Sequence, residues 1–340
     1  MEAGLETKPR RPWRRWVLLA LMIVGFIIGG IIVPVRPEIS VKAENLLGEG
    51  AAWIRLPVIG ELHLVNTLPT LVVTVALICL LAYSAHRSLT DSRKTDLVPR
   101  GIGNVMEAFF ELVYDLTEGA TGAKWAPVIF PWFATIMFYV LLANLLKLIP
   151  GFESVGILHH ATAEGHPIAP LAANWAVLLP GDGEFVLTPF LRGISVDFNF
   201  TLALALVSVV MTQVVGFRAQ GIGYLSKFFN FRTMFKVPFF GAMDFLVGLL
   251  ELISELAKIL SFSFRLFGNM FAGVVLVAVV AGLLGKISIV PSMLMMFELF
   301  VGVIQAFVFG MLTMVFMAQA TQGHGHEEQR AETEVDAHEI

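Results

Sequence analysis

The stretch SFSFRLFGNMFAG, residues 261–273, places Arg265 inside a run that is apolar for most of the distance from Phe239 to Leu284. A charge near the middle of a bilayer costs roughly 2.5–3.5 kcal/mol on insertion scales. An arginine at that depth therefore normally faces protein or water and has a function. Arg265 is predicted to face away from lipid.

The composition of the whole chain assigns it to the lipid bilayer. Of its 340 residues, 56% are hydrophobic and 15% are charged, which is too apolar for a soluble globular domain. The formal net charge is -4 and the basic residues are spread along the chain, so no nucleic-acid partner is predicted. A single cysteine, Cys79, excludes an internal disulfide framework.

Six segments are apolar and long enough to cross a membrane, since a core about 30 Å thick needs about 20 apolar residues per helix. They are residues 16–33, 68–85, 128–149, 194–217, 241–284 and 289–320. The last two are too long for one perpendicular crossing. The first of these two is expected to tilt strongly, to lie partly in the membrane plane, or to break near Gly248 or Gly268. The predicted fold class is an all-α polytopic membrane protein with about six membrane helices, the last two forming a long, tilted hairpin.

The positions of Lys and Arg predict the orientation of the spans. With a cytoplasmic N-terminus, 15 of the 23 basic residues fall in cytoplasmic segments and six on the opposite side. The positive-inside rule favours this arrangement, which places both termini in the cytoplasm. An alternative stays open, because RRPWRRW followed by an apolar run also fits a cleavable signal peptide over residues 1–33.

Three further segments lie outside the predicted spans. Residues 100–122, RGIGNVMEAFFELVYDLTEGATG, are amphipathic and predict a cytoplasmic helix lying at the membrane surface or against a partner. Residues 151–189 are rich in Gly, Pro and His and predict an extracytoplasmic loop. Residues 321–340 predict a disordered acidic tail, in which His324 and His326 offer a weak metal site. The predicted face of the amphipathic helix comprises Val105, Ala108, Phe109, Leu112, Val113 and Leu116.

The helix that carries Arg265 has one polar, small-residue stripe and one apolar face. At 100° per residue, the stripe comprises Glu251, Ser254, Lys258, Ser261, Gly268, Asn269 and Ala272, with Glu255 at its edge. In the following helix Glu298, Gly302 and Gln305 share a face. Two alternatives stay open in which these polar residues have only a structural function. Arg265 could pair with Glu255 or Glu298 of its own chain, and Glu298 and Gln305 could merely satisfy other polar groups of the hairpin.

Arginine suits a fixed positive charge beside a moving proton. Its guanidinium stays protonated throughout the accessible pH range, whereas a buried lysine can lose its proton. It can therefore hold a passing carboxylate ionised without relaying protons itself.

ELISELAKILSFSFRLFGNMFAG, residues 251–273, resembles the signature of the a subunits of the membrane (Fo) sector of F-type ATP synthases. The resemblance extends over residues 68–320. Its further matches are GNVMEAFFELVYD at 103–115, NLLKLIPGF at 144–152, DFNFTLALAL at 197–206 and IQAFVFGMLTMVFMAQA at 304–320.

The resemblance implies a proton-translocating stator subunit that is not itself an enzyme and carries no cofactor. Its implied partners are a ring of c subunits, the b subunits of the peripheral stalk, the remaining F1Fo subunits and the lipid bilayer. Arg265 matches the essential arginine, Gln305 the glutamine near it, and Glu298 a residue of the outer half-channel. The other implied proton-path residues are Asn269, Glu251 and Ser261 on the cytoplasmic side and Asp197, Asn199 and Thr201 on the outer side.

Three features depart from the family pattern. Position 274 is Val where the family often has Glu or His paired with position 298, so Glu298 is expected to work alone or with His159, His160 or His166. Lys147 stands where the family usually has glycine, and the sequence does not indicate a function for its charge. The span at 16–33 precedes the family core, which divides the chain into an extension (1–66), a membrane domain (67–320) and a tail (321–340).

Two other classes of function compete with the stator. A self-contained secondary transporter or channel would use Arg265 to bind an anionic substrate, and it predicts an internal repeat that is not visible. An intramembrane metalloenzyme would use His159, His160 and His166, but these lack the HExxH spacing. No GxxxxGK[ST] loop occurs in the sequence, and proton coupling and sodium coupling are both left open.

Overall fold

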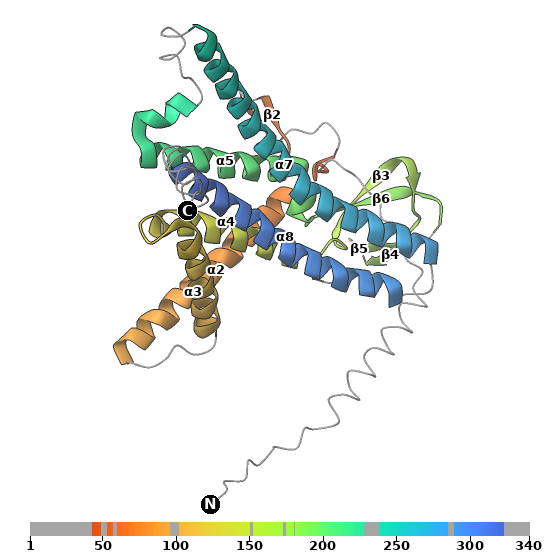
Figure 1. The fold of residues 1–340 in the computed structure, drawn as a ribbon. Coiled ribbons are helices and arrows are strands. Elements are labelled where there is room, and N and C mark those ends of the chain that lie inside the picture. Colours follow the sequence, from red (N-terminus) through yellow and green to blue (C-terminus); the bar gives the residue numbers. More distant parts are fainter. Residues whose placement is uncertain are drawn as a thin grey trace, which may run out of the picture. The chain divides into compact units, whose positions relative to one another are not determined.

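The computed structural model describes residues 43–48, 53–56, 60–95, 102–149, 152–172, 175–179, 181–227, 238–284 and 289–322 (Figure 1). The predicted span at 16–33, the alternative signal peptide, and His324 and His326 of the tail lie outside these residues. The helices are α2 (Thr67–Thr95), α3 (Ile102–Thr121), α4 (Ala126–Leu146), α5 (Phe198–Gln220), α7 (Pro238–Leu284) and α8 (Ile289–Thr321), with short turns η1 (Ile194–Val196) and η2 (Gly221–Lys227). The strands are β1 (Ile54–Leu56), β2 (Gly60–Leu62), β3 (Gly156–Gly165), β4 (Ile168–Ala172), β5 (Trp175–Leu178) and β6 (Gly183–Pro189).

The chain divides into two compact units. The larger, here called the core unit, comprises Ser40–Ile157, Thr188–Ala272 and Glu298–Ile340. The smaller comprises Met1–Ile39, Leu158–Leu187 and Gly273–Phe297. Arg265, Lys147 and the residues that contact them all belong to the core unit.

The predicted fold class is confirmed, because the chain is mostly helical. Among the described residues, five helical segments are long and apolar enough to cross a membrane. They are Thr67–Arg87, Ala126–Leu146, Phe198–Tyr224, Leu246–Leu283 and Met293–Thr321. Each of these segments overlaps one of the predicted spans.

Helix α7 is continuous over 47 residues, so the break considered near Gly248 or Gly268 is wrong (Figure 1). At 1.5 Å per residue it is about 70 Å long, more than twice the thickness of a hydrocarbon core. A glycine within an apolar helix lowers its stability without necessarily ending it. The helix must therefore tilt strongly or lie partly in the membrane plane.

The amphipathic helix is confirmed as α3, but its predicted buried face is only partly correct. Val113 is 2% exposed and Phe109 packs against the same core, as expected. Leu112, by contrast, is 59% exposed, and Val105 and Leu116 are exposed as well. Helix α3 instead buries a stripe through Phe109, Val113 and Thr117, which leaves a second apolar stripe uncovered by the described residues.

The predicted loop at 151–189 contains four of the strands, which the sequence analysis did not predict. Strand β3 pairs with β6, and β4 pairs with β5 in antiparallel register, Ile168 opposite Leu178. Within the smaller unit, the ring of His160 lies 4.6 Å from that of Phe185. All four residues of strand β5, Trp175–Leu178, are apolar, so its sequence lacks the alternation of apolar and polar residues by which half-buried strands are recognised.

The hydrophobic centre of the core unit joins α3, α4, α5 and α8. Its buried members are Val113, Ile129, Phe133, Ala134, Met137, Val215, Met314 and Met317. Helix α7 adds an aromatic contact, because the ring of Phe262 lies 5.1 Å from that of Phe309 in α8. The close approach of α4 and α8 depends on Gly310, where an added Cβ would lie 2.7 Å from Met137 Cβ and 2.9 Å from Phe133 Cε2.

The substitution Gly310→Ala is expected to lower the stability of the chain by about 1–3 kcal/mol, the usual cost of overpacking a core. It should lower the temperature at which the chain aggregates out of the detergent-purified complex. Gly119→Ala in α3 is the matched control, because an added Cβ there meets nothing within 4 Å. Alanine favours the helix by about 1 kcal/mol, so equal effects at the two positions would contradict the packing argument.

Candidate functional site

Arg265 lies on α7 beside an open groove of the core unit. The groove has a volume of about 360 Å³. Its lining residues are Ser254, Ala257, Lys258, Ser261, Phe262, Arg265, Leu312 and Phe316. The groove thus brings together Arg265 and three members of the predicted polar stripe, spaced along α7 by helical turns, and α8 provides its other wall.

No carboxylate of the described residues lies within ion-pairing distance of Arg265, and both predicted candidates pair with lysines. Glu255 Oε1 accepts a hydrogen bond of 2.7 Å from Lys258 Nζ. Glu298 Oε1 accepts one of 2.5 Å from Lys147 Nζ. The alternative of an internal ion pair between Arg265 and Glu255 or Glu298 is therefore not what the structure contains. Arg265 is half-buried, so its guanidinium can be reached by a group from another molecule.

Asn269 and Gln305 connect α7 to α8 one turn from Arg265. Asn269 Nδ2 donates a hydrogen bond of 2.7 Å to Gln305 Oε1. Gln305 is 3% exposed, and its Nε2 is buried without a hydrogen-bond partner among the described residues. A buried amide donor without a partner costs free energy. A hydrogen bond from this nitrogen to an acceptor outside the described residues would remove that cost.

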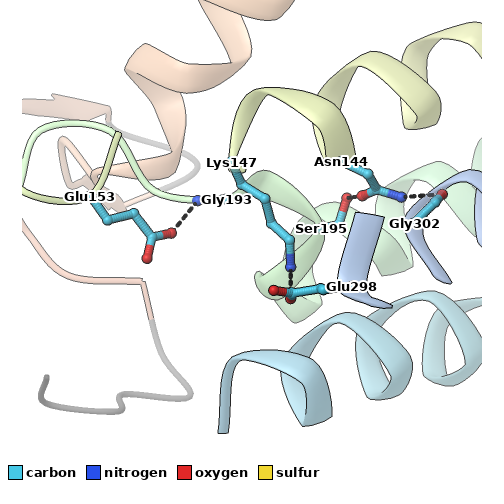
Figure 2. A network of polar contacts seen from close by, with 7 residues as sticks. All are labelled: Asn144, Lys147, Glu153, Gly193, Ser195, Glu298 and Gly302. Atoms are coloured by element: carbon cyan, nitrogen blue, oxygen red, sulfur yellow. Dashed lines mark hydrogen bonds and ion pairs between the residues drawn. The ribbon is translucent and has the colours of Figure 1, made fainter. Parts of the chain in front are cut away.

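Glu298 and Lys147 form a buried ion pair between α8 and the end of α4 (Figure 2). Their side chains are 9% and 4% exposed. Lys147 is a partner of Glu298 that the sequence did not indicate, and the action of Glu298 alone or with an outer-loop histidine stays a prediction. Of those histidines, His166 Nδ1 lies 3.0 Å from the carbonyl of Gly181 and His160 lies against Phe185.

Asn144 joins three elements one turn before Lys147 on α4 (Figure 2). Its Nδ2 donates to the carbonyl of Gly302 in α8 at 3.0 Å, and its Oδ1 accepts from Ser195 Oγ in η1 at 2.7 Å. Asn144 is 1% exposed. The two helices approach closely here, since a Cβ added at Gly302 would lie 3.2 Å from Asn144 Cβ.

The inner face of α8 therefore carries a row of polar groups. Glu298, Gly302 and Gln305 follow one another at spacings of four and three residues, which places them on one face of the helix. The row is about 10 Å long at 1.5 Å per residue. It runs from the Lys147 pair, past Asn144, to the Asn269 contact near Arg265.

The predicted outer-side residues of α5 have structural contacts in the described chain. Asp197 caps α5, because its Oδ1 accepts from Asn199 N at 2.9 Å. Its Oδ2 accepts from Thr67 Oγ1 at 3.0 Å. Thr201 Oγ1 donates to the carbonyl of Phe198, and Asn199 is exposed. The geometry gives Asp197 a capping function and ties it to the start of α2.

Of the three predicted cytoplasmic-side residues, only Ser261 lines the groove beside Arg265. Asn269 is engaged with Gln305, and Glu251 lies near the hydroxyl of Tyr224, on the turn of α7 before Ser254. Within the described residues, no three or more His, Cys, Asp or Glu side chains are grouped so that they could hold a metal ion.

Sequence reasoning missed Asn144 and Ser195 and gave Lys147 no function. The partners of these residues are 151 positions away for Lys147 and 158 for Asn144, so helical spacing does not reveal them. One signal was available. A lysine at the end of an apolar span needs a carboxylate when it is buried.

Comparison with known proteins finds a match to the family model described as ATP synthase A chain over residues 68–318. The chain is 30% identical over 289 residues to ATP synthase subunit a of Mycobacterium bovis, covering 84% of this chain and 97% of that protein. It is 32% identical to ATP synthase subunit a of Desulfotalea psychrophila, covering 68% of this chain and 76% of that protein. A third relative is ATP synthase subunit a of Helicobacter pylori, at 30% identity over 70% of this chain and 85% of that protein.

Proposed function

The chain belongs to the ATP synthase A chain family, and from this premise we propose that its polar residues form two proton paths that meet at Arg265. It is a multi-pass, non-catalytic, proton-translocating stator subunit of Fo in the F1Fo complex. The proposal names the residues that carry the protons, the subunits that they meet and the orientation of the chain in the membrane.

The inner path is the groove that Arg265 shares with Ser254, Lys258 and Ser261. It extends about 16 Å along α7, from Ser254 to Arg265, at 1.5 Å per residue. Its hydroxyl and ammonium groups can hydrogen-bond water, while its other wall is apolar. Glu251 lies one turn beyond Ser254 and is proposed to stand at the entrance of this path.

The outer path follows the polar row of α8. Glu298 is its titratable member and Gln305 its last member, joined to Asn269. Glu298 Oε2 has no hydrogen-bond partner in the described part of the chain, so this oxygen can take up and release a proton. Asn199 and Thr201 lie at the start of α5 and are kept as candidates for its outer end.

The two paths must not connect directly, and Arg265 provides the barrier between them. A carboxylate on a neighbouring c subunit can enter the hydrocarbon only in its neutral form, because an exposed charge there is expensive. Beside Arg265 it can ionise and give its proton to the inner path. A proton from the outer path then neutralises it again, and the ring advances. The driving force is roughly 2.3 kcal/mol per proton per 100 mV.

We place the c-subunit ring against the face of α7 that presents Arg265, and the b subunits of the peripheral stalk among the remaining partners. The exposed apolar stripe of α3 fits lipid or one of these subunits. The chain is proposed to lie in the cytoplasmic membrane of a bacterium with both termini in the cytoplasm. The N-terminal extension and acidic tail are kept as separate segments flanking residues 67–320.

A single observation carries the proposal: Arg265 has no acidic partner among the described residues, while the two candidate acids of the chain are each paired with a lysine. A guanidinium at membrane depth needs a counter-charge, and the partner subunit's carboxylate supplies one. A stand-alone transporter would use the same arginine to bind a free anion, and would then work without a ring.

The substitution Glu298→Gln tests the outer path, since glutamine keeps the size of the side chain but cannot carry a proton. ATP-driven proton pumping in inverted membrane vesicles is expected to fall about 10-fold or more, as for the loss of a general acid–base group. Glu111→Gln, on the exposed side of α3, should leave pumping unchanged. Equal pumping by the Glu298→Gln variant and the unmodified complex would remove Glu298 from the path.

A further inference from the structure

Lys147 is the charged residue for which the family pattern gives no function. It follows directly after α4, at the C-cap position, with φ -64° and ψ -20°. Its side chain is 4% exposed. A lysine is almost never buried to this extent without a partner, so its position in the fold needs a reason beyond solubility or anchoring to the membrane surface.

The ammonium of Lys147 engages one oxygen of Glu298 and leaves the other without a partner among the described residues. Nζ donates to Oε1 over 2.5 Å. An Oε1 atom accepts such a hydrogen bond whether the carboxyl group is ionised or protonated at Oε2. The contact can therefore persist through a complete cycle of proton uptake and release.

The stem of Lys147 lies against the backbone at Gly193. A Cβ added at Gly193 would lie 3.2 Å from Lys147 Cδ, so the backbone before η1 lies close along the stem. That backbone is itself fixed, because Gly193 N donates to Glu153 Oε1 at 3.0 Å (Figure 2). One turn earlier, Asn144 ties α4 to η1 and α8. The ammonium thus has a defined position from which to orient Glu298.

We infer that Lys147 is a positioning residue for proton transfer, which fixes the Glu298 carboxylate through Oε1 and reserves Oε2 for the proton. The proton binds Oε2 and leaves from Oε2 to the next carrier, and no proton of Lys147 is transferred. Because the pair is neutral when Glu298 is ionised, the carboxylate can remain buried at this depth. This inference rests on the proposed function, in which Glu298 belongs to the outer path.

Three variants of the complete F1Fo complex in inverted vesicles test the inference: Lys147→Met, Lys147→Arg and the double variant Lys147→Met with Glu298→Gln. Lys147→Met should lower ATP-driven proton pumping roughly 10-fold or more, since misplacing a reacting group is costly. Lys147→Arg, which still donates to Oε1, should keep at least about half of the pumping. ATP hydrolysis and the amount of assembled chain are measured in parallel, so that loss of assembly is not read as loss of transfer.

If Lys147→Met assembles poorly, the double variant still tests whether Lys147 acts through Glu298. It removes both charges together, which buried pairs tolerate better than the loss of one partner. If Lys147 acts through the Glu298 carboxylate, the double variant pumps within about twofold of Glu298→Gln alone, because the two effects are not additive. A further large drop in the double variant would overturn the inference, as would equal pumping by Lys147→Met and unmodified vesicles, or equal losses in Lys147→Arg and Lys147→Met.

An Arg265→Ala complex in the same vesicles separates this inference from the proposed function. Loss of pumping in Arg265→Ala together with normal pumping in Lys147→Met would overturn only the inference about Lys147 and leave the proposed proton paths in place. Normal pumping in Arg265→Ala would overturn the proposed proton paths themselves.

Discussion

Replacing Arg265 by alanine is expected to lower ATP-driven proton pumping at least about 100-fold in inverted membrane vesicles. The reason is electrostatic. Without the guanidinium, a carboxylate that ionises at membrane depth loses a stabilisation of roughly 2.5–3.5 kcal/mol, the insertion cost of one charge. Such a loss corresponds to a factor of about 100 in rate. The measurement is the rate of vesicle acidification at fixed ATP, normalised to the amount of assembled chain.

Two variants control the Arg265 experiment. Arg218→Ala removes a basic residue from the exposed last turn of α5 and should leave pumping unchanged. Lys at position 265 keeps a positive charge but lacks the planar fork of arginine and can lose its proton in apolar surroundings. Arg265→Lys should therefore remain impaired. Pumping by Arg265→Ala within twofold of the unmodified complex would show that this arginine is not the meeting point of the two paths.

Sequence periodicity was sufficient for the described membrane helices and for the polar stripe of α7, but not for the strands. Ser254, Lys258, Ser261 and Arg265 recur at helical spacing, and the structure places all four around one groove. The row on α8 was found in the same way, because Glu298, Gly302 and Gln305 are separated by whole turns. Helical spacing is a local property, so it can be read from one amino-acid sequence.

Contacts between helices are not local, and there the predictions stopped or were wrong. Lys147 was left without a function because its carboxylate lies on another helix. Asp197 stays a predicted proton-path residue, but its hydrogen bond from Thr67 of α2, 130 positions away, was not predicted. Which apolar side chains of α3 would be buried could not be predicted either, since that depends on the helices packed against it, α2 and α4 among them.

The substitution Asn144→Leu is expected to destabilise the core unit by about 2–4 kcal/mol. Leucine has nearly the same size but can neither donate nor accept, so it leaves Ser195 Oγ and the carbonyl of Gly302 without their partner. A buried polar group left unpaired costs about 1–3 kcal/mol. Little water reaches a residue that is 1% exposed, so few replacement hydrogen bonds are available. The measurement is the urea concentration at which the chain leaves the detergent-purified complex.

Matched substitutions separate the hydrogen bonds of Asn144 from its volume. Ser195→Ala removes one of the two bonds and should cost about 1 kcal/mol, less than Asn144→Leu. Asn104→Leu, on the exposed side of α3, should change the stability by no more than about 0.5 kcal/mol. If Asn144→Leu behaves like Asn104→Leu, then α4, η1 and α8 are held together by apolar packing alone. Lys147 follows Asn144 by one turn at the end of α4. In that case its ion pair with Glu298 would keep its geometry without the hydrogen bonds of Asn144.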